Sequence, residues 1–243
     1  MLETRIETCL WNTIQKSKLI PGIISSYGLS IITLLTFGFA MIAIPISGAN
    51  AINGGISYPY LETIQQFPRD YIWQYIAMVL MCAYLINFIL IKELVAETVK
   101  LFFKIGLAFA IISTAILLIN YYIQVNVVVI SLINKEFEGI PLLTQYNPHG
   151  IFIALEELGY IVMIFSFACL IPVYWKKEYK TKAISIIYSI GVIITVIGFI
   201  IISIQYGLDK KDRFEVIVIS VAWIVLIING ILIGKKLRKE IRT

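Results

Sequence analysis

Long uninterrupted apolar runs constrain the fold of this chain more than any other feature of its sequence. The run IGVIITVIGFIIISI, Ile190 to Ile204, is apolar almost all round a helix and shows no alternation with a period of two. A membrane-spanning strand needs that alternation, whereas about 20 apolar residues in a helix cross a bilayer and satisfy their own backbone hydrogen bonds. We therefore predict an all-α, polytopic membrane protein.

Six runs of this kind are present. The 243 residues are 59% hydrophobic and 14% charged, against about 25% charged residues in a soluble domain. The predicted transmembrane helices cover roughly residues 20–47, 71–91, 101–124, 149–174, 183–206 and 214–234. We expect them to form one transmembrane domain over residues 20–243.

The segment before the first span, residues 1–19, is predicted to be a short amphipathic helix on the membrane surface. Its apolar residues Leu2, Ile6, Leu10 and Ile14 recur at about helical spacing, with charged residues between them. Several of those charged residues are acids, which argues against the alternative of a cleaved signal peptide.

The distribution of basic residues predicts the orientation in the membrane. Of the 20 Lys and Arg residues, fifteen lie in the N-terminal segment, the second and fourth connections and the C-terminal tail, and five lie on the opposite side. Basic loops stay in the cytoplasm, so both termini are predicted to be cytoplasmic, in a prokaryotic cell membrane. Because the basic residues mark helix ends, the net charge of +5 predicts membrane lipids as neighbours and no nucleic-acid partner.

The stretch QYNPHGIFIALEELGY, Gln145 to Tyr160, places two adjacent acids in the fourth predicted span. Asn147 is a good N-cap and Pro148 fits the first helical turn, so we expect the helix to begin at about Pro148. A charged side chain at the centre of a membrane helix costs about 2.5–3.5 kcal/mol. We therefore predict that at least one of Glu156 and Glu157 holds a proton at neutral pH and that the two titrate together.

Helical spacing sorts this stretch into faces. His149, Glu156 and Tyr160 fall on one stripe together with Ile153, and this stripe is the candidate site. The neighbouring stripe, Gly150, Ala154 and Glu157, opens with two small residues and is the candidate contact for another helix.

The third predicted span ends on the same side of the membrane with the polar residues Asn120, Tyr121 and Gln124. We expect these groups to meet the acids of the fourth span and to form with them a polar pocket in the outer half of the bundle. Five further polar residues are predicted near that level, namely Asp70, Gln74, Gln205, Tyr206 and Glu215. Trp73 and Trp175 are predicted to be interface anchors.

Three functions are compatible with such a pocket. The favoured one is binding, sensing or transport of a small or lipid-like ligand, with proton coupling as an option. The second is a structural or accessory role in an envelope complex, where Glu156 only bonds a neighbouring helix. The third is an enzyme in which Glu156 serves as general acid and His149 as base.

Several chemistries lack their sequence signatures. One histidine excludes zinc sites built on two or three histidines. The chain shows no GxSxG nucleophile elbow, no P-loop and no dinucleotide fingerprint. We therefore predict neither a metal site nor a cofactor.

The block NPHGIF, Asn147 to Phe152, opens a membrane helix after a long connection and resembles the stage II sporulation protein M family. Those are polytopic membrane proteins of bacteria and archaea, and the bacterial namesake belongs to a machine that remodels the cell envelope. The family usually places an acid directly after the Phe, where this chain has Ile153 and carries its acids one turn later. The resemblance implies no catalytic mechanism and favours an accessory role.

Overall fold

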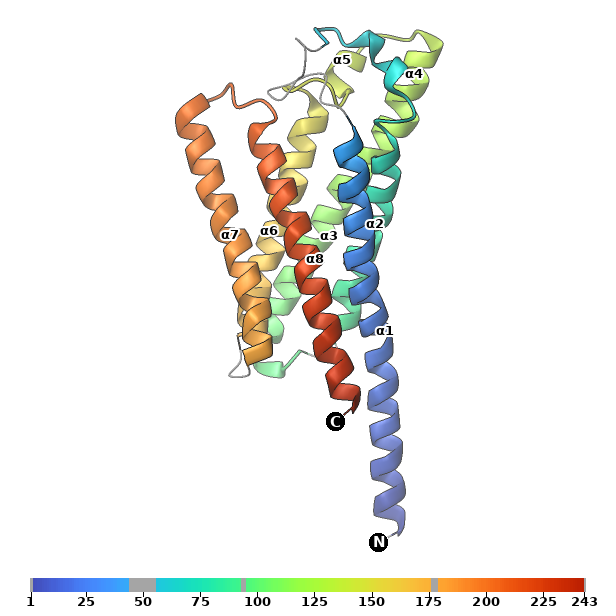
Figure 1. Ribbon diagram of the computed structural model, residues 1–243, viewed down its shortest axis with the longest axis vertical. Helices are drawn as coiled ribbons and strands as arrows, with labels where there is room; N and C mark the ends of the chain where they lie inside the picture. The colour runs from blue at the N-terminus through green and yellow to red at the C-terminus, as the bar shows by residue number, and fades with distance from the viewer. Residues whose placement is uncertain (1, 44–55, 93–94, 176–178, 243) are drawn as a thin grey trace.

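The computed structural model describes residues 2–43, 56–92, 95–175 and 179–242, and every regular element among them is helical. The long helices are α1 (Leu2–Ile42), α2 (Ile72–Ile91), α3 (Lys100–Ile123), α6 (Ile151–Tyr174), α7 (Tyr179–Tyr206) and α8 (Arg213–Arg242). Short helical segments connect them, namely η1 (Leu61–Gln66), η3 (Glu97–Val99), η4 (Gln124–Val128), α4 (Val129–Asn134) and α5 (Ile140–Leu143). Figure 1 shows the long helices side by side in one bundle.

Among the described residues, six helices are long and apolar enough to cross a membrane, in agreement with the predicted number of spans. Their apolar parts match the predicted spans to within a few residues, except that the third runs on to Asn134 and the sixth to Ile241. The end of the first predicted span, residues 44–47, lies outside the described residues.

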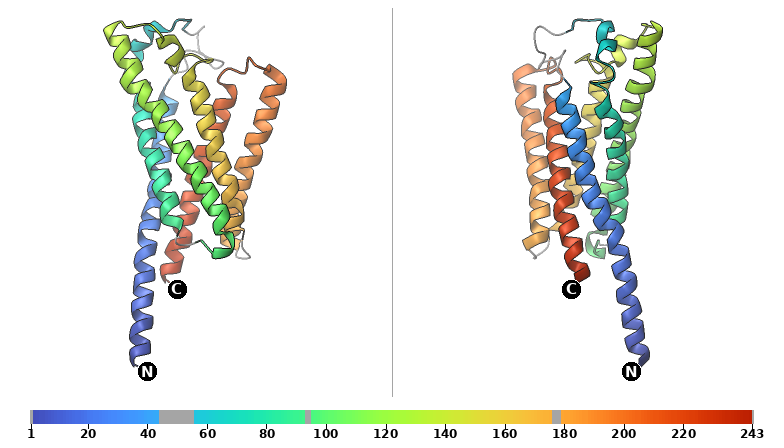
Figure 2. Two further views of the ribbon diagram at one scale, coloured as in Figure 1. Left: turned by 180° about the vertical axis from the view of Figure 1, so that it is seen from behind. Right: turned by 45° about the vertical axis from the view of Figure 1, so that its right-hand side comes forward.

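Both chain termini lie at the same end of the bundle (Figure 1). We call this the terminal end, and the opposite end, which carries η1, α4 and α5, the capped end. Residues 2–18 are helical and continue into the first span as one helix, α1, whose first turns project beyond the other helices (Figures 1 and 2). That the N-terminal segment lies on the membrane surface stays a prediction.

The third helix reaches the capped end through a π-helical segment. The chain from Lys100 to Asn134 is helical throughout, and residues Gln124–Val128 form the π turn, η4, between α3 and α4. The left view of Figure 2 shows this helix running the length of the bundle. Val128, the last residue of the π turn, and Leu132 in α4 pack against Ile140 of α5, so the cap rests on the extension of the third helix.

The fourth predicted helix begins later than Pro148. α6 starts at Ile151, with Gly150 in extended conformation before it. Asn147 does not cap this helix, because its side-chain oxygen accepts the backbone N–H of His149 (2.9 Å) and its amide donates to the carbonyl of Pro141 (2.7 Å). The NPHG residues therefore form an Asx turn that fixes the entry to α6.

Small residues close the terminal half of the bundle. A Cβ atom added to Gly230 of α8 would lie 2.2 Å from the Ser30 hydroxyl and 2.6 Å from the Ser26 carbonyl of α1. Ser30 also donates to the Ile227 carbonyl at 2.9 Å. α1 and α8 thus approach closely enough here that only glycine fits.

Candidate functional site

A cavity of about 470 Å³ lies at the capped end of the bundle. Its walls come from the end of α1, the start of α2, the Gln145–Tyr146 segment, and the first turns of α6 and α8. α3 contributes no lining residue, so the cavity does not lie between the third and fourth spans as predicted. The helices spread apart toward this end in Figure 1 and in the left view of Figure 2.

The lining combines aromatic rings with carboxyl groups. The aromatic residues are Phe37, Trp73, Tyr146, Phe152 and Trp223, and the acids are Asp70, Glu156, Asp212 and Glu215. The remaining lining residues are Ala40, Met41, Ala43, Gln145, Ile153, Val216, Ile219 and Ser220. This mixture of a mostly apolar wall and a few polar groups is typical of small-molecule sites.

Two of the acids form a buried pair. Glu156 of α6 is 1% exposed and Glu215 of α8 is 7% exposed; both line the same cavity, and each is an ionisable neighbour of the other. Two carboxyl groups that share a buried site can hold one proton between them. The acid that shares the cavity wall with Glu156 is Glu215 from another helix, whereas the adjacent Glu157 forms an ion pair with Lys210.

A chain of hydrogen bonds supports Glu156 from behind. The Tyr121 hydroxyl of α3 donates to Glu156 Oε1 at 2.6 Å and lies 3.1 Å from the Tyr160 hydroxyl. The indole N–H of Trp223 donates to the Tyr160 hydroxyl at 2.9 Å. Because each hydroxyl has one proton, the bonds run from Trp223 through Tyr160 and Tyr121 to Glu156. This arrangement fixes one face of the carboxyl group and leaves the other toward Glu215.

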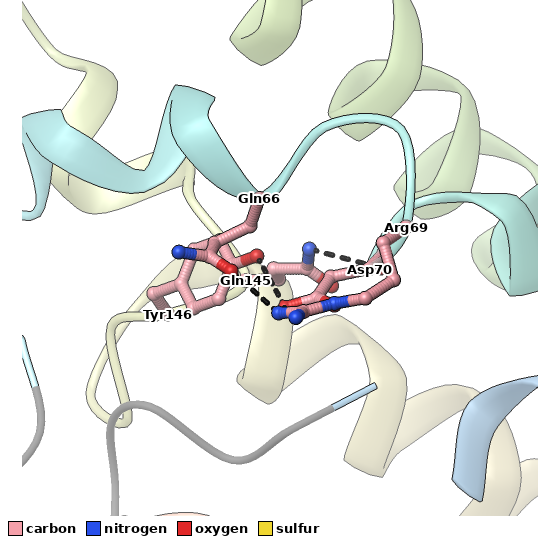
Figure 3. Close-up of polar contacts among 5 residues, drawn as sticks. All are labelled: Gln66, Arg69, Asp70, Gln145 and Tyr146. Atoms are coloured by element: carbon pink, nitrogen blue, oxygen red, sulfur yellow. Dashed lines mark hydrogen bonds and ion pairs between the residues drawn. The ribbon is translucent and has the colours of Figure 1, made fainter. Parts of the chain in front are cut away.

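A second polar network joins the cap to the cavity wall (Figure 3). Arg69 binds both Asp70 and Gln66, and the Tyr146 hydroxyl donates to Asp70 Oδ2 at 3.3 Å. The Gln145 side chain donates to the Asp70 carbonyl at 3.4 Å. The hydrogen bond to Asp70 raises the pKa of the Arg69 guanidinium. Burial raises the pKa of the Tyr146 hydroxyl, and neighbouring Tyr71 and Asp70 raise it further.

Two predicted site residues of the third span, Asn120 and Gln124, do not line the cavity and instead form hydrogen bonds to backbone groups of neighbouring segments. Asn120 donates to the Phe152 carbonyl at 3.0 Å. Gln124 donates to the Leu143 carbonyl and accepts the Gln145 N–H at 2.9 Å. Asn120 thereby holds α3 against the first turn of α6, and Gln124 holds η4 against the chain segment that leads into α6.

The structure separates Glu157 and His149 from the buried pair. Glu157 forms an ion pair with Lys210, whose ammonium group lies 5.4 Å from the ring centroid of Phe214. The His149 side chain is 56% exposed and its Nε2 lies 3.5 Å from Asp209. Neither residue lines the cavity, so the geometry does not bring His149 and Glu156 together as a base and an acid.

The face of α6 that meets α3 differs from the predicted one. Ala154 is exposed, whereas Gly159 is buried and its carbonyl accepts the Ser113 hydroxyl at 2.8 Å. A Cβ atom on Gly159 would lie 2.6 Å from the Leu117 side chain, so this glycine permits the close approach. Of the predicted contact stripe of Gly150, Ala154 and Glu157, Ala154 is exposed, so the stripe does not form a continuous helix contact.

Sequence reasoning also assigned some residues to the wrong environment or left them out of the site. Trp73 is 9% exposed and packs on Trp223, so it belongs to the cavity wall and not to the membrane interface. Trp175 is 56% exposed. Glu215 and Asp70 were expected in the outer polar cluster but not in the site, and both are buried in the lining. Gln205, expected in the same cluster, is exposed.

The fold defines a polytopic α-helical membrane protein with a carboxyl pair beside a cavity at one end. No protein-family model matches the chain, and neither the curated proteins nor the solved structures gave a match. Membership of the stage II sporulation protein M family stays a prediction that rests on Asn147 to Phe152.

Proposed function

We propose that this chain binds a small amphipathic ligand in the capped-end cavity, as a multi-pass protein of a prokaryotic cytoplasmic membrane. Both termini lie in the cytoplasm in this proposal, so the cavity is on the outer side. The ligand is a small organic or lipid-like molecule. A proton shared by Glu156 and Glu215 provides a means of coupling ligand binding to proton uptake or release.

One observation carries the proposal. The cavity measures about 470 Å³, within the range of about 300–1,000 Å³ common for small-molecule sites. Its wall holds Glu156 and Glu215, ionisable groups that a membrane helix carries only at a cost, and such groups usually mark functional sites. The residues behind Glu156 are all hydrogen-bonded, so the wall is organised and not merely loosely packed.

Contact quenching of tryptophan tests binding directly. In purified protein whose only tryptophan is Trp223, we expect saturable quenching by at least one of three para-bromophenylbutyl probes, the amine, the alcohol and the carboxylic acid. A protein whose only tryptophan is Trp175, which is exposed, should show only the non-saturable quenching that partition into detergent produces.

Blocking the cavity provides the matched control. Ser220→Phe places a large ring in the lining and should abolish the saturable phase, whereas Ile204→Phe on the outer face of α7 should leave it unchanged. If none of the probes quenches Trp223 saturably, or if Ser220→Phe quenches like its parent, the cavity is not a binding site.

Thiol labelling tests the orientation. In a variant without native cysteines, Leu208→Cys, at a fully exposed position in the α7–α8 connection, should react with an impermeant maleimide in intact cells. Arg238→Cys at the terminal end should react only after the cells are opened. The opposite pattern would place the cavity on the cytoplasmic side.

Infrared spectroscopy tests the shared proton. We expect the carbonyl band of a protonated carboxylic acid at neutral pH, and we expect Glu156→Gln to remove or shift it. Glu157→Gln should leave the band unchanged, because Glu157 pairs with Lys210. Absence of the band from the wild-type protein would show that both acids of the pair are ionised and would remove the basis for proton coupling.

A further inference from the structure

We propose that the ligand of the cavity is an organic cation, with an ammonium group between Glu156 and Glu215 and an apolar part against the aromatic wall. This inference rests on the proposed function, because it names the chemical class of the ligand that the cavity binds.

The first observation is that none of the described residues supplies a cation to the buried pair. Nearby acids have basic partners, Asp70 with Arg69 and Glu157 with Lys210. Among the described residues, no Lys, Arg or His forms an ion pair with Glu156 or Glu215. Two acids that are nine-tenths or more buried and lack a basic partner leave negative charge uncompensated. A cationic ligand would compensate it.

The surroundings of Glu215 strengthen this point. The acids Glu156, Asp212 and Glu157 are among its ionisable neighbours and add negative charge around it. The hydrogen bonds from Trp223 through Tyr160 and Tyr121 end at Glu156, and none of them reaches the carboxyl oxygens of Glu215. Glu215 also lines the cavity. A donor from the ligand would satisfy these oxygens.

The second, independent observation is the aromatic character of the wall. Trp73 and Trp223 stand with ring centroids 6.3 Å apart and an interplanar angle of 68°, and Phe37 and Phe152 line the same space. The faces of such rings attract ammonium groups, and cages of this type bind alkylated amines. The combination of rings and carboxyl groups selects a cation with an apolar substituent over a neutral or anionic molecule of equal size.

A metal ion fits this wall less well. No group of three or more His, Cys, Asp or Glu side chains with suitable spacing occurs in the part of the chain that the structure describes. Calcium takes about six to eight oxygen ligands, and magnesium demands near-octahedral oxygen coordination. Aromatic rings supply no such ligands, whereas they suit an organic ammonium ion.

The experiment compares the three para-bromophenylbutyl probes on the protein that contains only Trp223. We expect the amine to bind at least about tenfold more tightly than the alcohol, since hydrogen bonds to charged groups are among the strongest in proteins. The carboxylic acid should bind more weakly than the alcohol. In the double variant Glu156→Gln/Glu215→Gln, we expect the preference for the amine to disappear, so that the amine and the alcohol bind with about equal affinity.

Two further variants keep the test decisive. Glu157→Gln should keep the full preference for the amine, because Glu157 is paired and lies outside the lining. If the double variant does not fold, Glu215→Gln alone should still lower the amine affinity severalfold without changing that of the alcohol.

The possible outcomes separate this inference from the proposed function. Equal binding of amine and alcohol, or a preference that survives in the double variant, would overturn the cationic ligand while leaving the cavity as a binding site. Absence of saturable quenching by all three probes would overturn both. A preference that is lost with Glu157→Gln would place the recognition of charge at the Lys210 side of α6.

Discussion

The two halves of the bundle handle polar groups in opposite ways. In the terminal half, side chains such as Ser30 and Asn87 are uncharged and bond directly across helix contacts, with 2.9 Å from Ser30 to Ile227 and 3.0 Å from Asn87 to both Ser25 and Ser26. In the capped half, ionisable groups surround a cavity of about 470 Å³. The helices of the terminal half are closely packed, whereas those of the capped half surround a cavity.

The two halves also differ in how their polar groups affect the stability of the bundle. Uncharged hydrogen bonds and glycine contacts stabilise a membrane bundle at little cost. Buried acids without a basic partner do the reverse, and proteins retain such groups mainly where function requires them. The comparison therefore indicates the capped half as the functional half, and the following three predictions test it.

The largest effect is expected at Gly230. Gly230→Leu forces a side chain into the space of Ser30 and Ser26, so it should lower the free energy of unfolding by about 3 kcal/mol or more. Gly38→Leu is the matched control, because nothing lies within 4 Å of a Cβ atom there. It should stabilise by up to about 1 kcal/mol through helix propensity. Thermal unfolding of both variants in detergent measures the difference, and equal loss would show that the terminal half is not tightly packed.

An intermediate effect concerns the cap and depends on pH. Burial raises the pKa of Tyr71, which precedes α2, to about 12, whereas an unfolded tyrosine titrates near about 10. The folded state therefore holds this proton more tightly, so the contribution of Tyr71 is fully present below about pH 10 and is lost as the pH rises toward 12.

Comparison with a phenylalanine variant isolates this contribution. Between pH 9 and 11 the stability of the wild-type protein relative to Tyr71→Phe should fall by about 1 kcal/mol. Thermal unfolding of the two proteins at matched pH values measures it. A difference that stays constant over this interval would show that the Tyr71 hydroxyl is accessible to solvent.

The smallest effects are of opposite sign in the two halves. Asn87→Ala removes the amide bonds to Ser25 and Ser26 and should destabilise by about 1 kcal/mol. Glu215→Gln removes a buried ionisable group and lets an amide donate to Glu156, so it should stabilise by about 1 kcal/mol. Thermal shifts in the same direction for both variants would remove the distinction between the halves.

The sequence was sufficient to predict the fold at the level of helices. Apolar length determines where a chain crosses a bilayer, and all six predicted spans match helices of the structure. The boundary at Pro148 was wrong, because Asn147 bonds within its own turn and so delays the start of α6 to Ile151. Local residue preferences do not distinguish these two uses of one asparagine.

The candidate site was predictable only in part. Glu156, Tyr121 and Tyr160 come together as their polarity and spacing indicated. Glu215 was not assigned to the site, because the packing of α8 against α6 is a tertiary fact that periodicity within each helix does not contain. Similarly, adjacency in sequence favoured Glu157 as the partner of Glu156, whereas successive residues of a helix point about 100° apart.

The π turn at Gln124–Val128 lets one continuous helix serve two different neighbours. Before the turn, the register of α3 presents Asn120 and Tyr121 to α6; from the end of the turn onward, the register presents Val128 and Leu132 to the cap. Removing a single residue from the turn would rotate the whole extension by about 100° about the helix axis. The length of this segment thus sets the rotation of the cap-facing extension relative to the membrane bundle. A one-residue change in length there would turn Leu132 away from the cap while Asn120 and Tyr121 still face α6.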